Sequence, residues 1–457
     1  MTLLSHDATA LGDRIAGDVS VPGDARWDAA RQAFNLTIDQ RPTAIVIPRD
    51  ARDVAQAVDF ARERGLRIAA QATGHNAGPL GSLDDTLLVR TSRLGGVSVD
   101  AAARRVRVGA GVTWAGVTPA LSDVRLAALH GSSPGVGIVG YSLGGGMGWL
   151  ARKHGLQANA VTAIELVTAD GRVLRVDAER EPELFWALRG GGGGFGVVTA
   201  MEFRVVPVAE LYAGAMFFEP AAAADVLHAW NELLPALPDE LTSWATILQF
   251  PPAPEVPEAL RGRSFAVVLG AFLGSEADGR ALLAPVRELG PAIDTFAMQP
   301  PIALAELAMD PPDPLPYLGA HRLTGALPAA AIDELVAVAG PASGSPLAMV
   351  QLRHLGGALA RRAPDAGARA TLPGEISMFA VGAAGDPSST AAVAETLQAV
   401  DAALAPHAAG LYSNFVEVAA DASAFFDAET WSRLRSVKRR YDPADLFRAN
   451  HHVPAAP

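Results

Sequence analysis

The chain has 457 residues, half of them hydrophobic, with a formal net charge of −12 and no cysteine. This length exceeds what one hydrophobic core usually organises, so we expect more than one domain. The negative charge argues against nucleic acid or anionic membranes as partners and favours a neutral or cationic small molecule. Without cysteine the chain has no disulfide framework, no thiolate chemistry and no cysteine-ligated zinc site.

Two segments are natural candidates for a targeting or membrane signal, and neither has the required pattern. Residues 1–7 lack a basic segment followed by an apolar core, so they do not resemble a secretory signal. Residues 126–151 carry no formal charge, but their glycines, serines and proline suit a transmembrane helix poorly. We therefore predict a soluble, cytoplasmic protein that binds no membrane, and the sequence makes no prediction of oligomeric state.

The first part of the chain alternates strand and helix. Residues 43–48 are a short β-branched run, and Asp50 is placed to cap a helix that Gly65 ends. Residues 68–71 return as a strand that leads directly into a loop. Further elements follow, with strands predicted at 86–90, 97–99 and 106–108 and a helix over 112–121 that begins or is interrupted near Pro119.

The loop after the second strand has the composition of a ligand cradle. Its sequence is Gln71-Ala72-Thr73-Gly74-His75-Asn76. Small residues beside the histidine let the backbone approach a ligand closely and leave N–H groups free for an anion such as a pyrophosphate. The alternative is a tight turn whose histidine caps a neighbouring element.

The glycine-rich segment 130–149 contains formal matches to two unrelated motifs, and both fail in context. Residues 135–140 match the dinucleotide fingerprint, but three glycines at 144–146 follow where a helix is needed, and the first acid, Glu165, comes late. Residues 140–144 match the nucleophile elbow of serine hydrolases, which must end a strand and open a helix. We therefore predict neither a nicotinamide-binding Rossmann fold nor a serine hydrolase, and we expect irregular backbone here.

A second glycine-rich turn spans residues 190–194. It follows a predicted hairpin of strands 163–168 and 173–176 and a helix over 183–188, and it leads into a strand that ends near Val206. A flexible linker seldom sits between a tryptophan-bearing helix and a β-branched strand. This position favours a cofactor-contacting turn.

Beyond Pro207 the pattern is that of an α+β substrate domain. We predict strands at 212–218, 243–250, 265–273 and 347–355 and helices at 221–234 and 390–404. In the strand 347–355, Gln351 and Arg353 point to one face and Leu352 and His354 to the other. The proline-rich stretch 298–316 is predicted either as a loop over the site or as a plain surface excursion.

The last part of the chain carries Leu411-Tyr412-Ser413-Asn414-Phe415 and a basic helix over 431–441 that Asp442-Pro443 stops. The cluster Lys438-Arg439-Arg440 is either part of a specific motif or a solvated helix face. The histidines at 354, 451 and 452 have no further ligand at helical spacing, so no metal site is predicted.

Four of these features together resemble one family, the berberine-bridge-enzyme-like branch of the vanillyl-alcohol oxidase superfamily of flavoproteins. They are the His75 loop, the segment 131–137, the Tyr412 motif and the run from Arg433 to Phe447. The resemblance covers nearly the whole chain. It implies an α+β fold with a PCMH-type FAD-binding domain (1–206), a substrate domain with an antiparallel sheet covered by helices (207–406) and a berberine-like segment (407–457) that returns to the FAD domain.

The resemblance implies how FAD is held. In the family the histidine of the first loop binds FAD covalently, and it maps onto His75. Ser133 stands where bicovalent members have a cysteine, so we expect one covalent bond. His130 lies beside the flavin loop or caps the backbone. The remaining FAD contacts are expected at Gln71, Ala72, Thr73, Gly74, Asn76, Ser132, Val136, Gly137, Gly140, Gly144, Gly145, Gly148, Val198 and Asn450.

The resemblance also implies an activity. It is an FAD-dependent oxidase that passes a hydride from an alcohol, amine, phenolic or polyketide-type substrate to flavin N5, after which O2 reoxidises the flavin and yields H2O2. Val136 borders the face that oxygen approaches. Tyr412 is the expected base, with Arg353 as its cation and Gln351 and Asn414 beside the substrate; the alternative is that Tyr412 is a core aromatic. A dehydrogenase with another acceptor and a redox-neutral, flavin-templated cyclase are the alternative functions.

Overall fold

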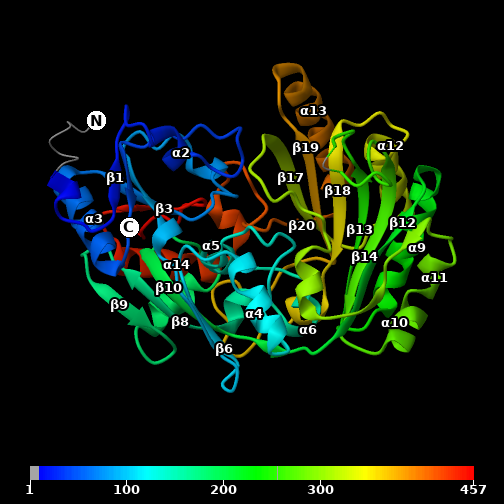
Figure 1. The fold of residues 1–457 in the computed structure, drawn as a ribbon, viewed down its shortest axis with the longest axis horizontal. Helices are drawn as coiled ribbons and strands as arrows, with labels where there is room; N and C mark the ends of the chain where they lie inside the picture. The colour runs from blue at the N-terminus through cyan, green and yellow to red at the C-terminus, as the bar shows by residue number, and fades with distance from the viewer. Residues whose placement is uncertain (1–9, 255, 457) are drawn as a thin grey trace.

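In the computed structural model, which describes residues 10–254 and 256–456, the chain forms two bodies that lie side by side (Figure 1). One body takes the beginning and the end of the chain, drawn blue to green and red, and the other takes the middle, drawn green to orange. Residues 1–7, on which the prediction against a secretory signal rests, lie outside the described residues. Within the described ranges, no helix is both long and apolar enough to cross a bilayer.

The first sheet follows the predicted order of strand, helix, strand and ligand loop. Asp50 accepts hydrogen bonds from the backbone N–H groups of Arg52 and Asp53, and Gly65, with a φ of 63°, ends helix α3 (Ala51–Arg64). The strand order is β1-β2-β4-β3-β21, and only β1 runs antiparallel to its neighbour. The strands are β1 (Asp18–Ser20), β2 (Ala44–Ile47), β3 (Arg67–Gln71), β4 (Thr86–Arg90) and β21 (Phe447–Arg448). The His75 loop therefore leaves from the carboxyl end of β3.

The second sheet is antiparallel and shares one core with the first, in which Trp114 packs edge-on against Phe203 and Tyr141. Gly171, with a φ of 82°, turns the predicted hairpin between β8 and β9. In order across the sheet, the strands are β5 (Val97–Asp100), β6 (Arg105–Gly109), β10 (Val197–Arg204), β8 (Val161–Val167) and β9 (Val173–Val176). A separate two-stranded antiparallel ribbon pairs β7 (Leu126–Ala127) with β11 (Val206–Pro207), which follows β10 in the sequence.

Short helices connect the strands of this body. The helix predicted over 112–121 begins near Pro119, as one of the two alternatives predicted: α4 (Thr118–Asp123) has Pro119 in its first turn, where the missing N–H is not needed. The residues before it form a 3-10 turn (Trp114–Gly116). The others are α2 (Trp27–Arg31), α5 (Ile138–Leu143), α6 (Ala151–His154), α7 (Gln157–Ala160), α8 (Pro182–Leu188) and α14 (Ala428–Tyr441).

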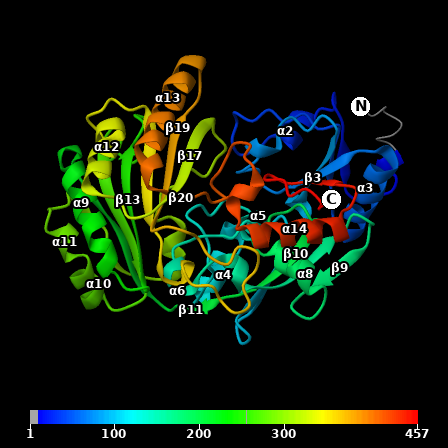
Figure 2. The ribbon, with the colours of Figure 1, turned by 180° about the vertical axis from the view of Figure 1, so that it is seen from behind.

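The second body is one antiparallel sheet with helices on its outer face (Figures 1 and 2). In order, the strands are β15 (Ile293–Asp294), β12 (Leu211–Phe218), β14 (Ser264–Phe272), β13 (Leu241–Gln249), β18 (Leu347–His354), β19 (Ile376–Ala383), β17 (Tyr317–Thr324) and β20 (Ala408–Gly410), with β16 (Ala297–Gln299) beside β12. The helices are α9 (Ala223–Leu233), α10 (Glu276–Leu282), α11 (Ala284–Arg287), α12 (Ala329–Ala339) and α13 (Pro387–Leu404).

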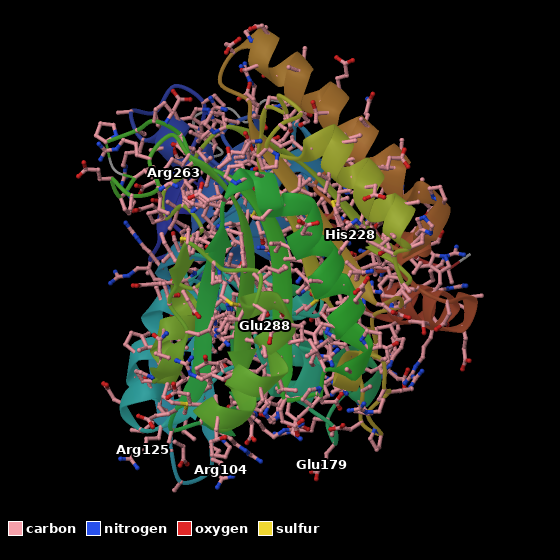
Figure 3. All side chains as sticks on the ribbon, turned by 90° about the vertical axis from the view of Figure 1, so that its right-hand side faces the viewer. Arg104, Arg125, Glu179, His228, Arg263 and Glu288 are labelled. Carbon is pink, nitrogen blue, oxygen red and sulfur yellow. The ribbon has the colours of Figure 1, made fainter. Side chains whose placement is uncertain are left out.

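The outer helices pack on the sheet through one apolar cluster and contact each other at their exposed edges. In the side view, His228 lies where α9 meets α12 (Figure 3), and its Nε2 is 2.7 Å from the Asp333 carboxylate of α12. The opposite, inner face of the sheet turns toward the first body, where Trp149 stacks on Trp244 with ring centroids 3.5 Å apart. The cavity described below lies on this inner face.

The C-terminal segment crosses from the second body back to the first. β20 still pairs with β17, so the chain leaves this sheet after Gly410, slightly beyond the predicted boundary at residue 406. It then passes through α14 to β21, which pairs with β3. The division of the chain into three segments at 206 and 406 stays a prediction.

The basic cluster at the end of α14 is not a uniformly solvated helix face. Lys438 is fully buried, and its Nζ donates to the Asp442 carboxylate at 2.6 Å and to the carbonyl of Gly194 at 2.8 Å. Arg440 beside it is exposed and pairs with Glu181 at the surface. Residues two positions apart on a helix point in different directions. Lys438 therefore fixes the C-terminal segment against the second glycine-rich turn, while Arg440 faces solvent.

Candidate active site

A cavity of about 530 Å³ lies between the two bodies. One side, which we call the cofactor wall, consists of lining residues from the segments 70–77, 131–144, 190–198 and 448–451. The other side, the substrate wall, consists of lining residues from β17, β18, β19 and the loop 308–315. Tyr412 to Glu417 of the returning segment line the cavity between them. This volume falls in the range of natural cofactor and ligand sites.

Most residues predicted for the site line this cavity. The C-terminal and substrate-wall members are Tyr412, Asn414 and Arg353. The cofactor-wall members are Gln71, Ala72, Thr73, Gly74, His75, Asn76, Ser132, Ser133, Val136, Gly137, Gly140, Gly144, Val198 and Asn450.

Three predicted site residues do not lie on the wall. Gln351 is buried behind it, where its Oε1 accepts from Arg353 Nε at 2.6 Å and its Nε2 donates to Thr246 at 3.1 Å. A Cβ on Gly148 would meet the His130 carbonyl oxygen at 1.7 Å, so this glycine serves backbone packing. A Cβ on Gly145 would meet the Tyr412 hydroxyl at 3.2 Å, so Gly145 packs behind the tyrosine. These three lie behind the wall, and their contacts with a bound group stay predictions.

His75 is held as a neutral imidazole with one nitrogen free. Its Nδ1 lies 2.7 Å from the Thr73 hydroxyl, while its Nε2 is buried and has no partner among the described residues. The Phe34 ring stacks on the imidazole with centroids 3.8 Å apart and planes 14° apart. Burial lowers the pKa of His75 to about 4. At neutral pH the imidazole is therefore uncharged, and Nε2 carries the nucleophilic lone pair in the tautomer whose Nδ1–H donates to Thr73.

The cofactor wall carries further polar atoms that lack partners. Both side-chain polar atoms of Gln71 and the Oδ1 of Asn76 are buried with no hydrogen-bond partner in the described part of the chain. Buried polar groups are nearly always paired, so this set indicates a bound group with donors and acceptors of its own. The glycines at 190–193 leave backbone open to the cavity on the same wall. A polar, flat group such as the isoalloxazine of FAD fits these residues.

Tyr412 is fully buried, and its hydroxyl oxygen is held by two donors. The Gly146 N–H donates to it at 2.7 Å and the Asn414 Nδ2 at 3.0 Å. Burial raises the pKa of Tyr412, and the nearby cations Arg369 and Arg353 oppose that rise. The hydrogen bond from the backbone matches the alternative in which Tyr412 is a core aromatic. Tyr412 also lines the cavity, so it belongs to both the core and the cavity wall.

Arg353 is a buried cation on the substrate wall. Its guanidinium lies 4.2 Å above the Trp244 ring and 4.7 Å from the Phe415 ring, and Gln351 holds its Nε. Burial lowers the pKa of Arg353 to about 10, and Asp310 opposes that change. The side chain is still positively charged at neutral pH, as the predicted pairing with Tyr412 requires.

The proline-rich stretch 298–316 includes a loop over the site. Its residues 308–311 and 315 line the cavity. Leu315 exchanges backbone hydrogen bonds with the first body, donating to the Phe34 carbonyl at 3.2 Å and accepting from the Leu36 N–H at 3.1 Å. The loop therefore ties the substrate wall to the segment whose Phe34 covers His75, and the alternative of a plain surface excursion is wrong.

Sequence reasoning missed several residues of the site. Arg369 comes from a segment without regular structure, and its Nη1 donates to the Phe425 carbonyl at 2.6 Å while its Nε and Nη2 are buried without partners among the described residues. No sequence pattern marks this arginine. Glu417 and Tyr317 share a hydrogen bond of 3.0 Å on the cavity wall. A single acid inside the apolar run 415–418 was the available signal for Glu417.

The motifs rejected from sequence have other roles. Ser142 is buried inside α5 and donates to the Ile138 carbonyl at 2.8 Å, so it is not a nucleophile at a strand end. The irregular backbone expected in this segment lies on both sides of this helix, over residues 131–136 and after Leu143. The His130 Nδ1 lies 2.8 Å from the Gly131 carbonyl, which is the backbone role left open above. In the described ranges no three acidic or histidine side chains are grouped to hold a metal ion.

Comparisons with known proteins agree with this arrangement. Residues 42–177 match the family model described as an FAD binding domain, and residues 411–454 match the one described as berberine and berberine like. (R)-6-hydroxynicotine oxidase of Paenarthrobacter nicotinovorans is 30% identical to the chain over 456 residues, which are 96% of this chain and 97% of that protein. The chain belongs to the berberine-bridge-enzyme-like family of FAD-linked oxidases.

Two further comparisons match part of the chain or its fold. Glucooligosaccharide oxidase of Sarocladium strictum is 38% identical over 189 residues, 40% of this chain and 38% of that protein. The crystal structure of 6-hydroxy-D-nicotine oxidase from Arthrobacter nicotinovorans matches with a TM-score of 0.81 at 27% identity, covering 96% of this chain and 98% of that one. The predicted family, the α+β fold with its FAD-binding domain and the class of FAD-dependent oxidase are confirmed.

Proposed function

We propose that the cavity holds FAD through one covalent bond to His75 and that the protein oxidises a small organic molecule, with O2 as acceptor and H2O2 as product. The observation that carries this proposal is the neutral His75 with its free, buried Nε2 on a wall whose other polar atoms also lack partners. Ser133 on the same wall has no thiol, so it forms no second thioether bond to the flavin. One attachment point therefore remains.

FAD, when bound, supplies a hydride acceptor at N5 of its isoalloxazine. The chain's own residues position the reactants and exclude water. The glycines of the cofactor wall admit the cofactor close to the backbone, and Gln71 and Asn76 offer amide groups to its polar edge. The loop 308–315 covers the substrate side of the cavity and shields it from solvent.

Tyr412 is the proposed base, and it takes the proton from the hydroxyl or amine whose carbon loses the hydride. The N–H groups of Gly146 and Asn414 and the cations Arg369 and Arg353 stabilise its phenolate. Because burial nevertheless raises the pKa of Tyr412, the phenolate is the minor form at neutral pH. The rate of flavin reduction should therefore rise with pH through the neutral and alkaline range.

The substrates are small organic molecules with an oxidisable alcohol, amine or phenolic centre. Two relatives support this range, since one is named for hydroxynicotine and the other for glucooligosaccharide oxidation. A dehydrogenase that passes electrons to another acceptor would use the same cavity, as would a cyclase without net redox change.

Turnover experiments separate the three activities. Purified protein is incubated with a panel of alcohols, amines and phenols, and oxygen consumption and H2O2 are measured together. The proposal expects one H2O2 for each O2 consumed and each substrate oxidised. Substrate oxidation only with an added artificial acceptor would favour the dehydrogenase, and product formation without O2 uptake or acceptor reduction would favour the cyclase.

A further inference from the structure

Glu417 is a carboxyl on the cavity wall that no cation compensates. Its Oε1 accepts a hydrogen bond from the Tyr317 hydroxyl at 3.0 Å, while its Oε2 is buried and lacks a partner among the described residues. None of the ion pairs formed by the described residues includes it. Burial raises the pKa of Glu417 to about 7, against the Tyr317 hydrogen bond, which lowers it. A buried acid with one idle oxygen is costly unless a partner arrives.

The surrounding backbone is shaped to hold this carboxyl. A Cβ on Gly319 would lie 2.6 Å from Oε2, and a Cβ on Gly78 would lie 2.2 Å from the Glu417 carbonyl oxygen. Tyr317 fixes the carboxyl from the other side and extends to the His75 carbonyl at 3.4 Å. Gly319 thus leaves room for the carboxyl and Gly78 for the main chain of Glu417, while the Tyr317 hydroxyl fixes Oε1 and leaves Oε2 without a partner.

A row of aromatic rings connects Glu417 with Tyr412. The Phe415 ring lies 5.5 Å from the Tyr412 ring and 5.2 Å from the Phe379 ring, centroid to centroid. The Phe379 ring and the Glu417 carboxyl both flank Gly319, where an added Cβ would lie 3.3 Å from the ring and 2.6 Å from the carboxyl oxygen. The cavity therefore has an apolar middle, with Tyr412 at one end and Glu417 at the other.

The charges of the cavity are separated in the same way. Arg353 lies at the Tyr412 end. Its Nε donates to Gln351 and its guanidinium packs against the rings of Trp244 and Phe415, so it is not free to neutralise Glu417. Asp310 of the covering loop adds a second acid that acts on both Arg353 and Tyr317. Arg448 also lines the cavity, but its guanidinium pairs with Asp85. Among the described residues, no cation is therefore paired with the Glu417 carboxyl.

We propose that Glu417 binds the cationic nitrogen of the substrate, at the end of the cavity away from Tyr412. The substrate class is then an apolar or aromatic molecule that carries an ammonium group remote from the carbon that is oxidised. This inference rests on the proposed function, because it concerns the substrate of that reaction. The binding of a cation at Glu417, however, is measured without turnover.

The test uses the flavin-loaded protein and two probes that share an aromatic body. Benzyltrimethylammonium carries a permanent charge, and 2-phenylacetamide is neutral, so any pH dependence of binding belongs to the protein. Affinities are measured by calorimetry at pH 6, 7 and 8. Among the groups around Glu417, burial raises the pKa of Tyr317 well above neutral and lowers that of His75 to about 4, so neither titrates in this range. Burial also raises the pKa of Asp310, so its contribution to the pH dependence is measured separately with Asp310→Asn.

Wild-type protein should bind benzyltrimethylammonium more tightly as the pH rises from 6 to 8, by on the order of tenfold, because Glu417 ionises. Glu417→Gln should bind it at least about tenfold more weakly at pH 8 and without pH dependence. Binding of 2-phenylacetamide should be the same in both proteins. Glu276→Gln, which changes an exposed acid on α10, is the matched control and should behave as wild type.

Two further variants keep the proposal falsifiable. Tyr317→Phe removes the hydrogen bond that lowers the pKa of Glu417, so the pH midpoint for cation binding should move upward. Asp310→Asn should leave the midpoint in place. If Glu417→Gln keeps the wild-type affinity and pH dependence, or if Asp310→Asn alone abolishes them, Glu417 is not the cation site. Normal cation binding in a protein that produces no H2O2 would instead contradict the proposed function and leave this site standing.

Discussion

The two walls of the cavity are built from different chemistry. The cofactor wall is mostly glycine and small neutral side chains, and its polar atoms at Gln71, His75 and Asn76 lack partners among the described residues. The substrate wall has charged and aromatic side chains, among them Arg353, Asp310 and Phe379. A wall of small neutral groups suits one permanent ligand of fixed shape. A wall of charges and rings selects among exchangeable ligands by charge and by apolar contact.

The largest expected effect concerns Tyr412, which lines the cavity between the two walls. Tyr412→Phe removes the hydroxyl but not the ring, so the flavin should stay bound while the rate of flavin reduction falls by on the order of a hundredfold or more. Anaerobic stopped-flow reduction measures this rate. Tyr212→Phe, which removes a hydroxyl that bonds to Arg287 on the outer side of the second sheet, is the control and should reduce at the wild-type rate. Equal rates in Tyr412→Phe and wild type would show that the proton leaves by another route.

A second prediction concerns what fixes the cofactor wall in place. Lys438→Met leaves the buried Asp442 carboxylate without its cation, so the free energy of unfolding should fall by about 3–5 kcal/mol. Urea denaturation followed by circular dichroism gives this value. Arg440→Ala removes an exposed pair on the same helix and should cost less than about 1 kcal/mol. Similar losses in both variants would mean that Lys438 contributes no more than a surface charge.

A third prediction uses the pH dependence of stability to test the raised pKa of Glu417, which lies between the two walls. The pKa of Glu417 is raised by burial to about 7, above the usual 4.5, so the folded state retains a proton that the unfolded state loses between these values. Stability from this group is therefore complete at low pH and is lost as the pH rises toward 7. Relative to Glu417→Gln, wild type should lose up to roughly 3 kcal/mol of unfolding free energy between pH 5 and pH 8. Parallel pH profiles of the two proteins would contradict the raised pKa.

The smallest expected effect concerns oxygen at the cofactor wall. Val136 lines the cavity, and Val136→Ile adds one methylene there. Reoxidation of the reduced flavin by O2 should slow by on the order of tenfold, about 1.4 kcal/mol in activation free energy, while reduction by substrate changes little. Stopped-flow mixing of reduced protein with oxygenated buffer measures the first rate. An unchanged oxygen rate would remove Val136 as the gate.

The cofactor wall was largely predictable from sequence, and the substrate wall was not. The signals for the former are local, since Asp50 and Gly65 bound α3 and the strand that follows ends at the His75 loop. The residues of the substrate wall and of the returning segment meet only in the folded chain: Tyr317 contacts Glu417 across 100 positions of sequence. Arg369 lies in a segment with no periodic pattern, and no local rule places it beside Tyr412.

Two residues predicted to contact FAD do not line the cavity, for a related reason. Gly145 and Gly148 belong to the same glycine-rich segment as the residues that line the cavity, but they pack against Tyr412 and the His130 carbonyl. Composition marks a segment as glycine-rich without separating the glycines that face a ligand from those that admit another part of the chain. Only the close approaches in the structure make that distinction.

The central claim is that His75 holds FAD in this cavity by one covalent bond, and the absorption spectrum before and after acid precipitation tests it most directly. Wild-type protein should show a flavin spectrum, and its precipitate should remain yellow with no FAD in the supernatant. His75→Ala should release any flavin that it binds into the supernatant on precipitation. A colourless wild-type precipitate with all of the FAD in the supernatant would contradict the claim.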